Sequence, residues 1–246
     1  MMATTKSTRV KAPTRILPGS KSVSQADIHD VATSKPLGRV VIERGGAREN
    51  LLRCKKTVLI STLNTRTIRS IHLQEELCGL AKLYNQDIIG IQEHRIVHQD
   101  EEVRYQDLFD GYQLVSSFAW RNNAGISNGG VGILLSPKAK KSLLSCVCVS
   151  PRILCATFAG NPKTTVLITY CLTNTSVERE AEEHFKLLDK AIKQVPAHNF
   201  LVVLGDFNAR VGKDNYKFSY HESTNRNGEM LHNLAMENDL RPAMHR

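Results

Sequence analysis

Three polar side chains that each follow an apolar stretch are the residues of this sequence best suited to chemistry: Asn64, Glu93 and Asp206. A second carboxamide, Asn208, stands two positions after Asp206. Carboxylate and carboxamide oxygens are hard ligands of the kind that hold Mg²⁺. We therefore expect these residues to build one metal-capable site.

The stretches that precede these residues indicate the strands that would position them. Residues 57–63, 87–91 and 200–204 are largely apolar without regular alternation, a pattern typical of strands buried on both faces. Gly205 lets the backbone turn sharply after the third run. Three strands that stop on polar residues predict a site at one end of a sheet core.

The remaining pattern predicts an α/β protein. Helical spacing of apolar residues marks the segments 72–84, 177–195 and 228–238. Short apolar runs at 112–118, 130–135, 143–149, 153–158 and 165–170 indicate further strands, with a hairpin loop at 120–129 and a polar loop ending near residue 106. Consecutive hairpins favour antiparallel sheets, so we expect a two-sheet, mostly antiparallel β-sandwich flanked by helices.

Four motifs, in this order, carry a resemblance to a known family: STLNTRT, IIGIQEHR, ITYCLTN and GDFNARVG. Together they resemble the endonuclease/exonuclease/phosphatase superfamily over roughly residues 51–246. Three longer segments resemble the endonuclease domain of non-LTR retrotransposons and their domesticated, craniofacial development protein 2-like relatives. They are QEHRI, GGVGILLSPKA and YHESTNRNGEMLHNLAMENDL. The resemblance implies a phosphodiesterase that acts on DNA with Mg²⁺, or with Mn²⁺ in its place.

The resemblance also implies a role for each matched residue. Glu93 would be a metal ligand, and Asn64 would hold a metal-bound water or the neighbouring carboxylate. Asp206 would activate the attacking water, while Asn208 and Tyr170 would donate hydrogen bonds to the phosphate.

Further substrate contacts are expected at Asn174, Arg121 and Asn225. The loop that holds Asn174 lacks the proline that usually follows the tyrosine in the family. Arg95, beside Glu93, is compatible both with a contact to DNA phosphate and with a solvated loop.

One departure from the family leaves the function open. Related domains continue with further strands and end in Ser-Asp-His, a tripeptide that this sequence does not contain. We therefore expect a fold that is incomplete at its C-terminal end. The candidate functions are a DNA-nicking endonuclease, a truncated and inactive remnant that binds nucleic acid or a partner, and an abasic-site nuclease or other phosphoesterase.

Composition sets the remaining expectations. The first 56 residues carry 12 Lys and Arg against 4 Asp and Glu, whereas the other 190 carry 21 against 20. We expect a basic flexible arm at 1–50, suited to phosphate neutralisation, and a domain at 51–246. Six cysteines without a CxxC pair fit a reducing compartment, nuclear or cytoplasmic. No apolar run has the length of a membrane span.

Overall fold

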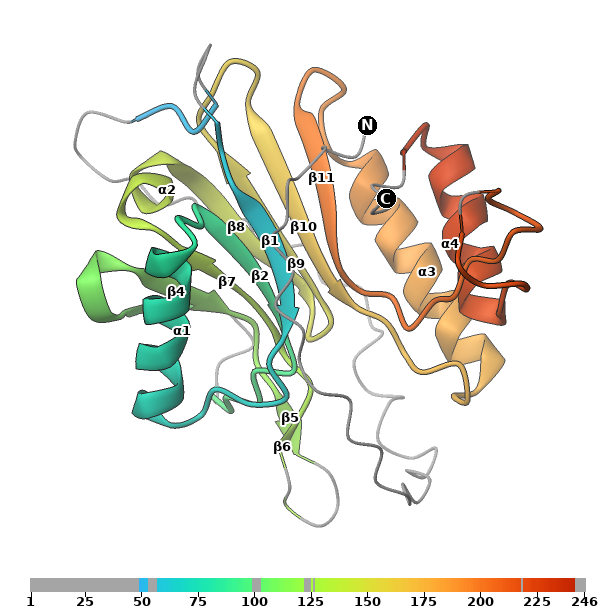
Figure 1. Cartoon of the computed structure of the whole chain (residues 1–246), viewed down its shortest axis with the longest axis horizontal. Coiled ribbons are helices and arrows are strands. Elements are labelled where there is room, and N and C mark those ends of the chain that lie inside the picture. Colours follow the sequence, from blue (N-terminus) through green and yellow to red (C-terminus); the bar gives the residue numbers. More distant parts are fainter. Residues whose placement is uncertain are drawn as a thin grey trace.

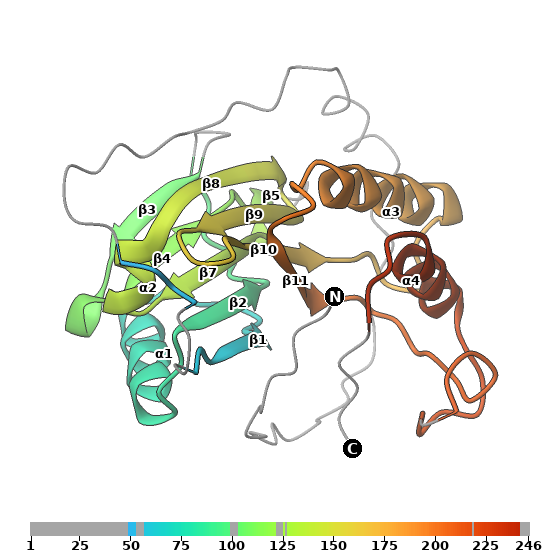
Figure 2. The same ribbon diagram turned by 90° about the horizontal axis from the view of Figure 1, so that it is seen from above.

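Two β-sheets face each other in this protein, and helices cover their outer surfaces (Figure 1). The computed structural model describes residues 49–52, 57–98, 103–121, 125, 127–217 and 219–241. The expected basic arm falls outside these residues except at its last two positions. Seen from above, α1 lies on one side of the pair of sheets and α3 and α4 lie on the other (Figure 2).

The first sheet has five strands in the order β1-β2-β7-β4-β3. Their bounds are Ile60–Asn64 for β1, Ile88–Gln92 for β2, Val131–Leu135 for β7, Gln113–Ser116 for β4 and Arg104–Asp107 for β3. β1 and β2 are parallel, and the other neighbours are antiparallel. A short hairpin, β5 (Trp120–Arg121) with β6 (Ser127–Asn128), projects from the end at which β1 and β2 finish (Figure 1).

The second sheet has four strands in the order β11-β10-β9-β8. Their bounds are Phe200–Asp206 for β11, Thr164–Tyr170 for β10, Ile153–Phe158 for β9 and Leu143–Ser150 for β8. Only β10 and β11 are parallel, so that both sheets are mostly antiparallel. Each sheet thus contributes one parallel pair, and β1 lies next to β11 across the sandwich (Figure 1).

In the described ranges four α-helices flank the sheets: α1 (Ile71–Leu83), α2 (Pro137–Ser142), α3 (Glu178–Lys193) and α4 (Arg226–Glu237). A 3₁₀ turn, η2, spans Phe109–Gly111. Helix α1 begins at a Ser70 cap, whose hydroxyl accepts a hydrogen bond from the Leu73 amide. None of the helices in the described part of the chain is long and apolar enough to cross a membrane.

Alternate residues of each central strand serve two different cores, which is why these runs lack a polar face. On β2, Ile88 packs between the sheets, whereas Ile89 and Ile91 pack against α1. On β10, Ile168 packs between the sheets and Leu167 against α3 and α4. The apolar burial in three layers is the main stabilising term for this architecture.

The two sheets approach closely at Gly90. A Cβ built there would lie 3.2 Å from Ile168 Cγ1 and 3.3 Å from Leu204 Cδ1. A larger residue would push β2 away from the β10–β11 pair. Glycine at this position therefore sets the separation of the strands whose ends carry the candidate site.

The expected two-sheet α/β architecture is confirmed, and two elements were missed. Strand β3 occupies residues expected to form a polar loop, because pairing with β4 rather than an apolar pattern defines it. Helix α2 is only six residues long. Its signal was present in the sequence: Ser136 caps it through a hydrogen bond from the Ala139 amide, and Pro137 follows at the first helical position.

A buried histidine predicts acid sensitivity of the fold. His184 on α3 is buried, its Nε2 lies 3.0 Å from the Thr169 hydroxyl, and burial lowers its pKa to about 3. As the pH falls below 6.5, the unfolded chain binds a proton that the folded chain does not, so stability is lost toward acid. Between pH 7 and pH 5 this histidine should account for a loss of about 2 kcal/mol in the free energy of unfolding.

The measurement is urea unfolding of the wild type and of His184→Gln at both pH values. The variant is expected to lose less stability than the wild type between pH 7 and pH 5. His198→Gln, at an exposed histidine, is the matched control and should lose as much as the wild type. An equal loss in all three proteins would contradict the assignment to His184.

Candidate functional site

Strand register brings the ends of both parallel pairs to one place. Asn64 lies beside Gln92 in the β1–β2 pair, and Tyr170 lies beside Asp206 in the β10–β11 pair. Side chains two positions apart on a strand point to the same face. Asn64 therefore faces the same way as Ile60, Tyr170 as Ile168, and Asp206 as Leu204, and these three apolar residues pack between the sheets. The pleat therefore turns all three side chains toward the space between the sheets.

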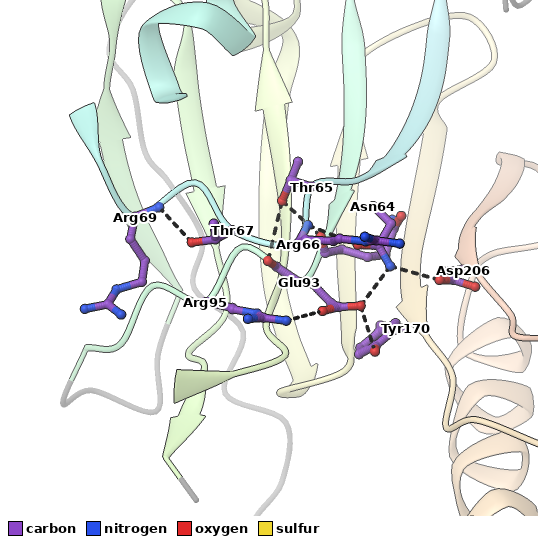
Figure 3. Close-up of polar contacts among 10 residues, drawn as sticks. Asn64, Thr65, Arg66, Thr67, Arg69, Glu93, Arg95, Tyr170 and Asp206 are labelled. Atoms are coloured by element: carbon purple, nitrogen blue, oxygen red, sulfur yellow. Dashed lines mark hydrogen bonds and ion pairs between the residues drawn. The ribbon is translucent and has the colours of Figure 1, made fainter. Parts of the chain in front are cut away.

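The carboxamide of Asn64 joins the two carboxylates of the site (Figure 3). Its Nδ2 donates to Glu93 Oε1 at 3.0 Å and to Asp206 Oδ2 at 2.9 Å. Its Oδ1 accepts a hydrogen bond from the backbone amide of Arg66 at 3.1 Å, which orients the amide group. Two acidic side chains from different sheets thus converge on one atom.

Glu93 is held by two further donors (Figure 3). The Tyr170 hydroxyl donates to Oε1 at 3.0 Å, and Arg95 Nη2 donates to Oε2 at 2.9 Å. Burial by itself raises the pKa of this carboxyl, but the hydrogen bonds from its three donors outweigh burial and hold the pKa below its ordinary value. Glu93 is therefore ionised at neutral pH although only 17% of its side chain is exposed.

Asp206 and Asn208 form a compact turn at the end of β11. The Asn208 backbone amide donates to Asp206 Oδ1 at 3.0 Å, and its side-chain Nδ2 donates to the carbonyl of Cys171 at 2.8 Å. The turn is thereby fixed to the end of β10. Within the described residues this is the one hydrogen bond that the Asn208 side-chain N–H groups donate, although the group carries two N–H donors.

Left-handed backbone is concentrated in the loops of the site. Arg66, Glu93, Arg95 and Asn208 all have φ between 46° and 57° although none is glycine. Such conformations are costly for residues with a Cβ and persist where the surrounding structure enforces them. The chain thus accepts local strain in order to aim the side chains of this site.

A cavity of about 440 Å³ opens beside Asp206. It is lined by the turn after β11 and by the start of α4, with Gly205, Asp206, Phe207, Asn208, Ala209, Arg210, Asn225 and Leu231 at its surface. Asp206 and Asn208 are therefore accessible to a ligand from this side.

None of the three expected substrate contacts forms a described hydrogen bond with Glu93 or Asp206. Asn174 is exposed, and its Oδ1 accepts a hydrogen bond from the Asn227 amide at 3.4 Å. Asn225 caps α4 by accepting from the Gly228 amide at 2.8 Å. Arg121 is exposed on the hairpin. The role of each in substrate binding remains a prediction.

Asn227 is a supporting residue that the sequence reasoning missed. Its side chain is fully buried, and its Nδ2 donates to the carbonyls of Leu172 at 2.7 Å and Phe207 at 3.3 Å. It therefore ties the loop after β10 to the turn after β11. The NRNG stretch was noticed only for its resemblance, since a buried asparagine has no signature that separates it from a solvated one.

The donor set fits a divalent metal ion. Within the described residues no group of three or more His, Cys, Asp or Glu side chains is placed to hold a metal. The anionic oxygens that converge are Glu93 Oε1 and Asp206 Oδ2, each within 3.0 Å of Asn64 Nδ2, whereas the Asn64 oxygen faces the Arg66 amide. Hard oxygen ligands that converge in this way suit Mg²⁺ or Mn²⁺ better than a soft metal.

The sequence matches one family model and two curated relatives. A model described as the endonuclease/exonuclease/phosphatase family matches residues 61–229. Craniofacial development protein 2 from Bos taurus is 24% identical over 185 residues, which are 75% of this chain and 30% of that protein. The protein of the same name from Tragulus javanicus is 23% identical with the same coverage. The matched region thus spans less than a third of these curated relatives.

Solved structures show a more distant likeness. The AP endonuclease LMAP from Leishmania major has a TM-score of 0.48 and 14% identity, covering 73% of this chain and 65% of that chain. The D. rerio TDP2 complexed with a single-strand DNA product has a TM-score of 0.39 and 18% identity, covering 61% and 60%.

The ligand set predicts which side chains govern metal binding. Mg²⁺ affinity, measured by isothermal titration calorimetry, should fall roughly tenfold or more in Glu93→Gln, because the substitution removes the anionic oxygen that is expected to bind the ion. Glu76→Gln, an exposed change on α1, should leave the affinity unaltered. Equal Mg²⁺ affinities in all three proteins would show that the ion binds elsewhere.

Proposed function

Because the chain belongs to the endonuclease/exonuclease/phosphatase family, we propose that it is a divalent-metal-dependent phosphodiesterase that nicks DNA. The observation that carries the proposal is the meeting of Glu93 and Asp206 on the Asn64 amide, with the Tyr170 hydroxyl at the same carboxylate. A phosphodiester needs its negative oxygens neutralised and a water aimed at phosphorus, and this cluster offers groups for both tasks.

Glu93 would be a ligand of the metal ion, Mg²⁺ or Mn²⁺, and Asn64 would hold this carboxylate or a metal-bound water through its amide. When bound, such an ion neutralises phosphoryl oxygens and supports the departing oxygen. The low pKa of Glu93 suits this role, because the carboxyl stays an anionic ligand at neutral pH.

The other residues would act on water and phosphate. Asp206 accepts the proton of the attacking water, whose oxygen bonds to phosphorus as the bond between phosphorus and the 3′-oxygen breaks. The departing oxygen takes a proton from solvent and becomes a 3′-hydroxyl, while the phosphate stays on the 5′ end. Asn208 donates a hydrogen bond to a phosphoryl oxygen as charge builds on it, and Tyr170 does so by turning its one O–H from Glu93 to the phosphate. Burial and the nearby Glu93 raise the pKa of Tyr170, so its hydroxyl keeps the proton that it donates.

Exposed cations around the carboxylates support DNA as the substrate. Arg66 and Arg69 are exposed on the loop after β1, and Arg121 is exposed on the hairpin. Arg121, Asn174 and Asn225 would contact phosphates that flank the scissile bond. The basic arm at 1–50 would add affinity without sequence preference, through counterion release.

The finer assignment is to endonucleases of retrotransposon origin, and it is supported by the motif wording and by the craniofacial development protein 2 relatives. A nuclear or cytoplasmic location would agree with the five free cysteines of the described residues. The domain boundary near residue 51 is part of the same proposal.

A plasmid assay tests the proposed activity. With Mg²⁺ the purified protein should convert supercoiled plasmid to nicked circles, and EDTA should stop the conversion. Asp206→Asn should slow nicking by roughly 10²–10⁴-fold through loss of the general base, and Tyr170→Phe by roughly 10²-fold through loss of a donor.

Glu76→Gln is the control and should nick at the wild-type rate. Nicking that survives in Asp206→Asn would identify a contaminant and reject the assignment. A strong preference for abasic over intact duplex would favour the repair-nuclease alternative. Binding of DNA without any cleavage would favour the inactive remnant.

A further inference from the structure

Arg152, in the turn between β8 and β9, is a partly buried cation bound closely to Tyr170. Its backbone carbonyl accepts a hydrogen bond from the Tyr170 amide at 2.9 Å, and its Nη1 donates to the Tyr170 carbonyl at 3.3 Å. Its guanidinium carbon lies 5.0 Å from the centroid of the Tyr170 ring. Within the described residues it forms no ion pair. Both backbone and side chain of Arg152 therefore act on one residue of the site.

The same guanidinium contacts the hairpin through Trp120. Its carbon lies 4.4 Å from the centroid of the indole ring, closer than to the phenol. The indole in turn packs on Gly129, where a Cβ would lie 2.0 Å from the ring, and where φ is +67°. Only glycine fits this backbone position beneath the indole. Arg152 thus joins the base of the hairpin to the tyrosine of the site.

These contacts reach Glu93 from two sides. On one side, Tyr170 donates to Oε1 of the carboxylate. On the other side, Arg95 donates to Oε2, and the Arg95 backbone amide donates to the Gly129 carbonyl at 3.0 Å. Tyr170 and Arg95, the two residues that donate to Glu93 besides Asn64, are therefore both connected to the packing of Trp120 and Arg152.

A planar cation suits this position. A guanidinium stacks on aromatic rings and keeps directed N–H groups, whereas the ammonium of lysine is a strongly hydrated point charge. Attraction between a cation and a ring strengthens when water is excluded. Burial lowers the pKa of Arg152, in agreement with such an environment.

We propose that Arg152 is a positioning residue, which holds the Tyr170 ring where its hydroxyl reaches Glu93 and makes the β5–β6 hairpin, through Trp120, a structural extension of the site. The inference rests on the proposed function only in that Tyr170 and Glu93 take part in cleavage. Arg152 itself acts through Tyr170.

The kinetic test uses Arg152→Met, which keeps much of the apolar stem and removes the guanidinium. We expect kcat for plasmid nicking to fall roughly tenfold or more with KM changed less than threefold, because the catalytic geometry is disturbed and no substrate contact is lost. Adding Tyr170→Phe to this variant should cost little more than Tyr170→Phe alone, since both changes remove the same action. Arg152→Lys should restore less than half of the lost kcat.

The control is Arg179→Met, at an exposed arginine of α3, which should keep the wild-type kcat. An unchanged kcat in Arg152→Met would overturn the proposal. So would a raised KM with unchanged kcat, which would make Arg152 a substrate contact, or fully additive losses in the double variant.

A second readout does not depend on cleavage, because Trp120 is the single tryptophan of the chain. Arg152→Met and Tyr170→Leu should each shift the Trp120 emission to longer wavelength and raise its quenching by acrylamide, whereas Arg179→Met should change neither. If the wild type does not cleave DNA, the proposed function fails and this measurement still judges the packing. Unchanged emission and quenching in both variants would overturn the proposal. If Arg152→Met does not fold, Arg152→Lys takes its place in this measurement.

Discussion

The candidate site depends on one polar contact, the carboxamide of Asn64 placed between two carboxylates that come from opposite sheets. Glu93 and Asp206 would repel each other in a partly buried space if no donor stood between them. The Asn64 amide satisfies both, and the Arg66 backbone fixes which way it faces. A metal ion would meet the same electrostatic need with full charge, which is why a structural contact and a candidate catalytic centre coincide.

Several features of the fold bring Glu93 and Asp206 close to Asn64. Parallel pairing of β1 with β2 and of β10 with β11 aligns the strand ends, and Gly90 allows the two pairs to come close. Asn227 then fastens the loops that leave β10 and β11. The strained backbone at Glu93 and Asn208 is tolerated because these surroundings hold it in place. The free energy gained by apolar packing thus offsets the cost of burying this cluster of polar groups.

Family membership and site geometry contribute different parts of the functional argument. The family model matches residues 61–229. The geometry adds which side chains face one another, and it draws in Arg95, Arg152 and Trp120, for which the motifs suggested little or nothing. Arg95 was considered either a phosphate contact or a solvated residue, and the structure places it on Glu93. DNA cleavage, the metal and its ligands remain proposals that rest on these contacts.

The sequence by itself determined the central strands and long helices, because unbroken apolar runs and helical periodicity are local patterns. It also determined that Asn64, Glu93, Tyr170 and Asp206 stand at strand ends, where polar side chains can gather. It could not reveal β3, whose pairing with β4 defines it, or the stack at Arg152, whose partners are distant in sequence. Only the tertiary structure decided that strand ends from two different sheets face one another, because register and sheet separation arise from contacts between segments that no local pattern records.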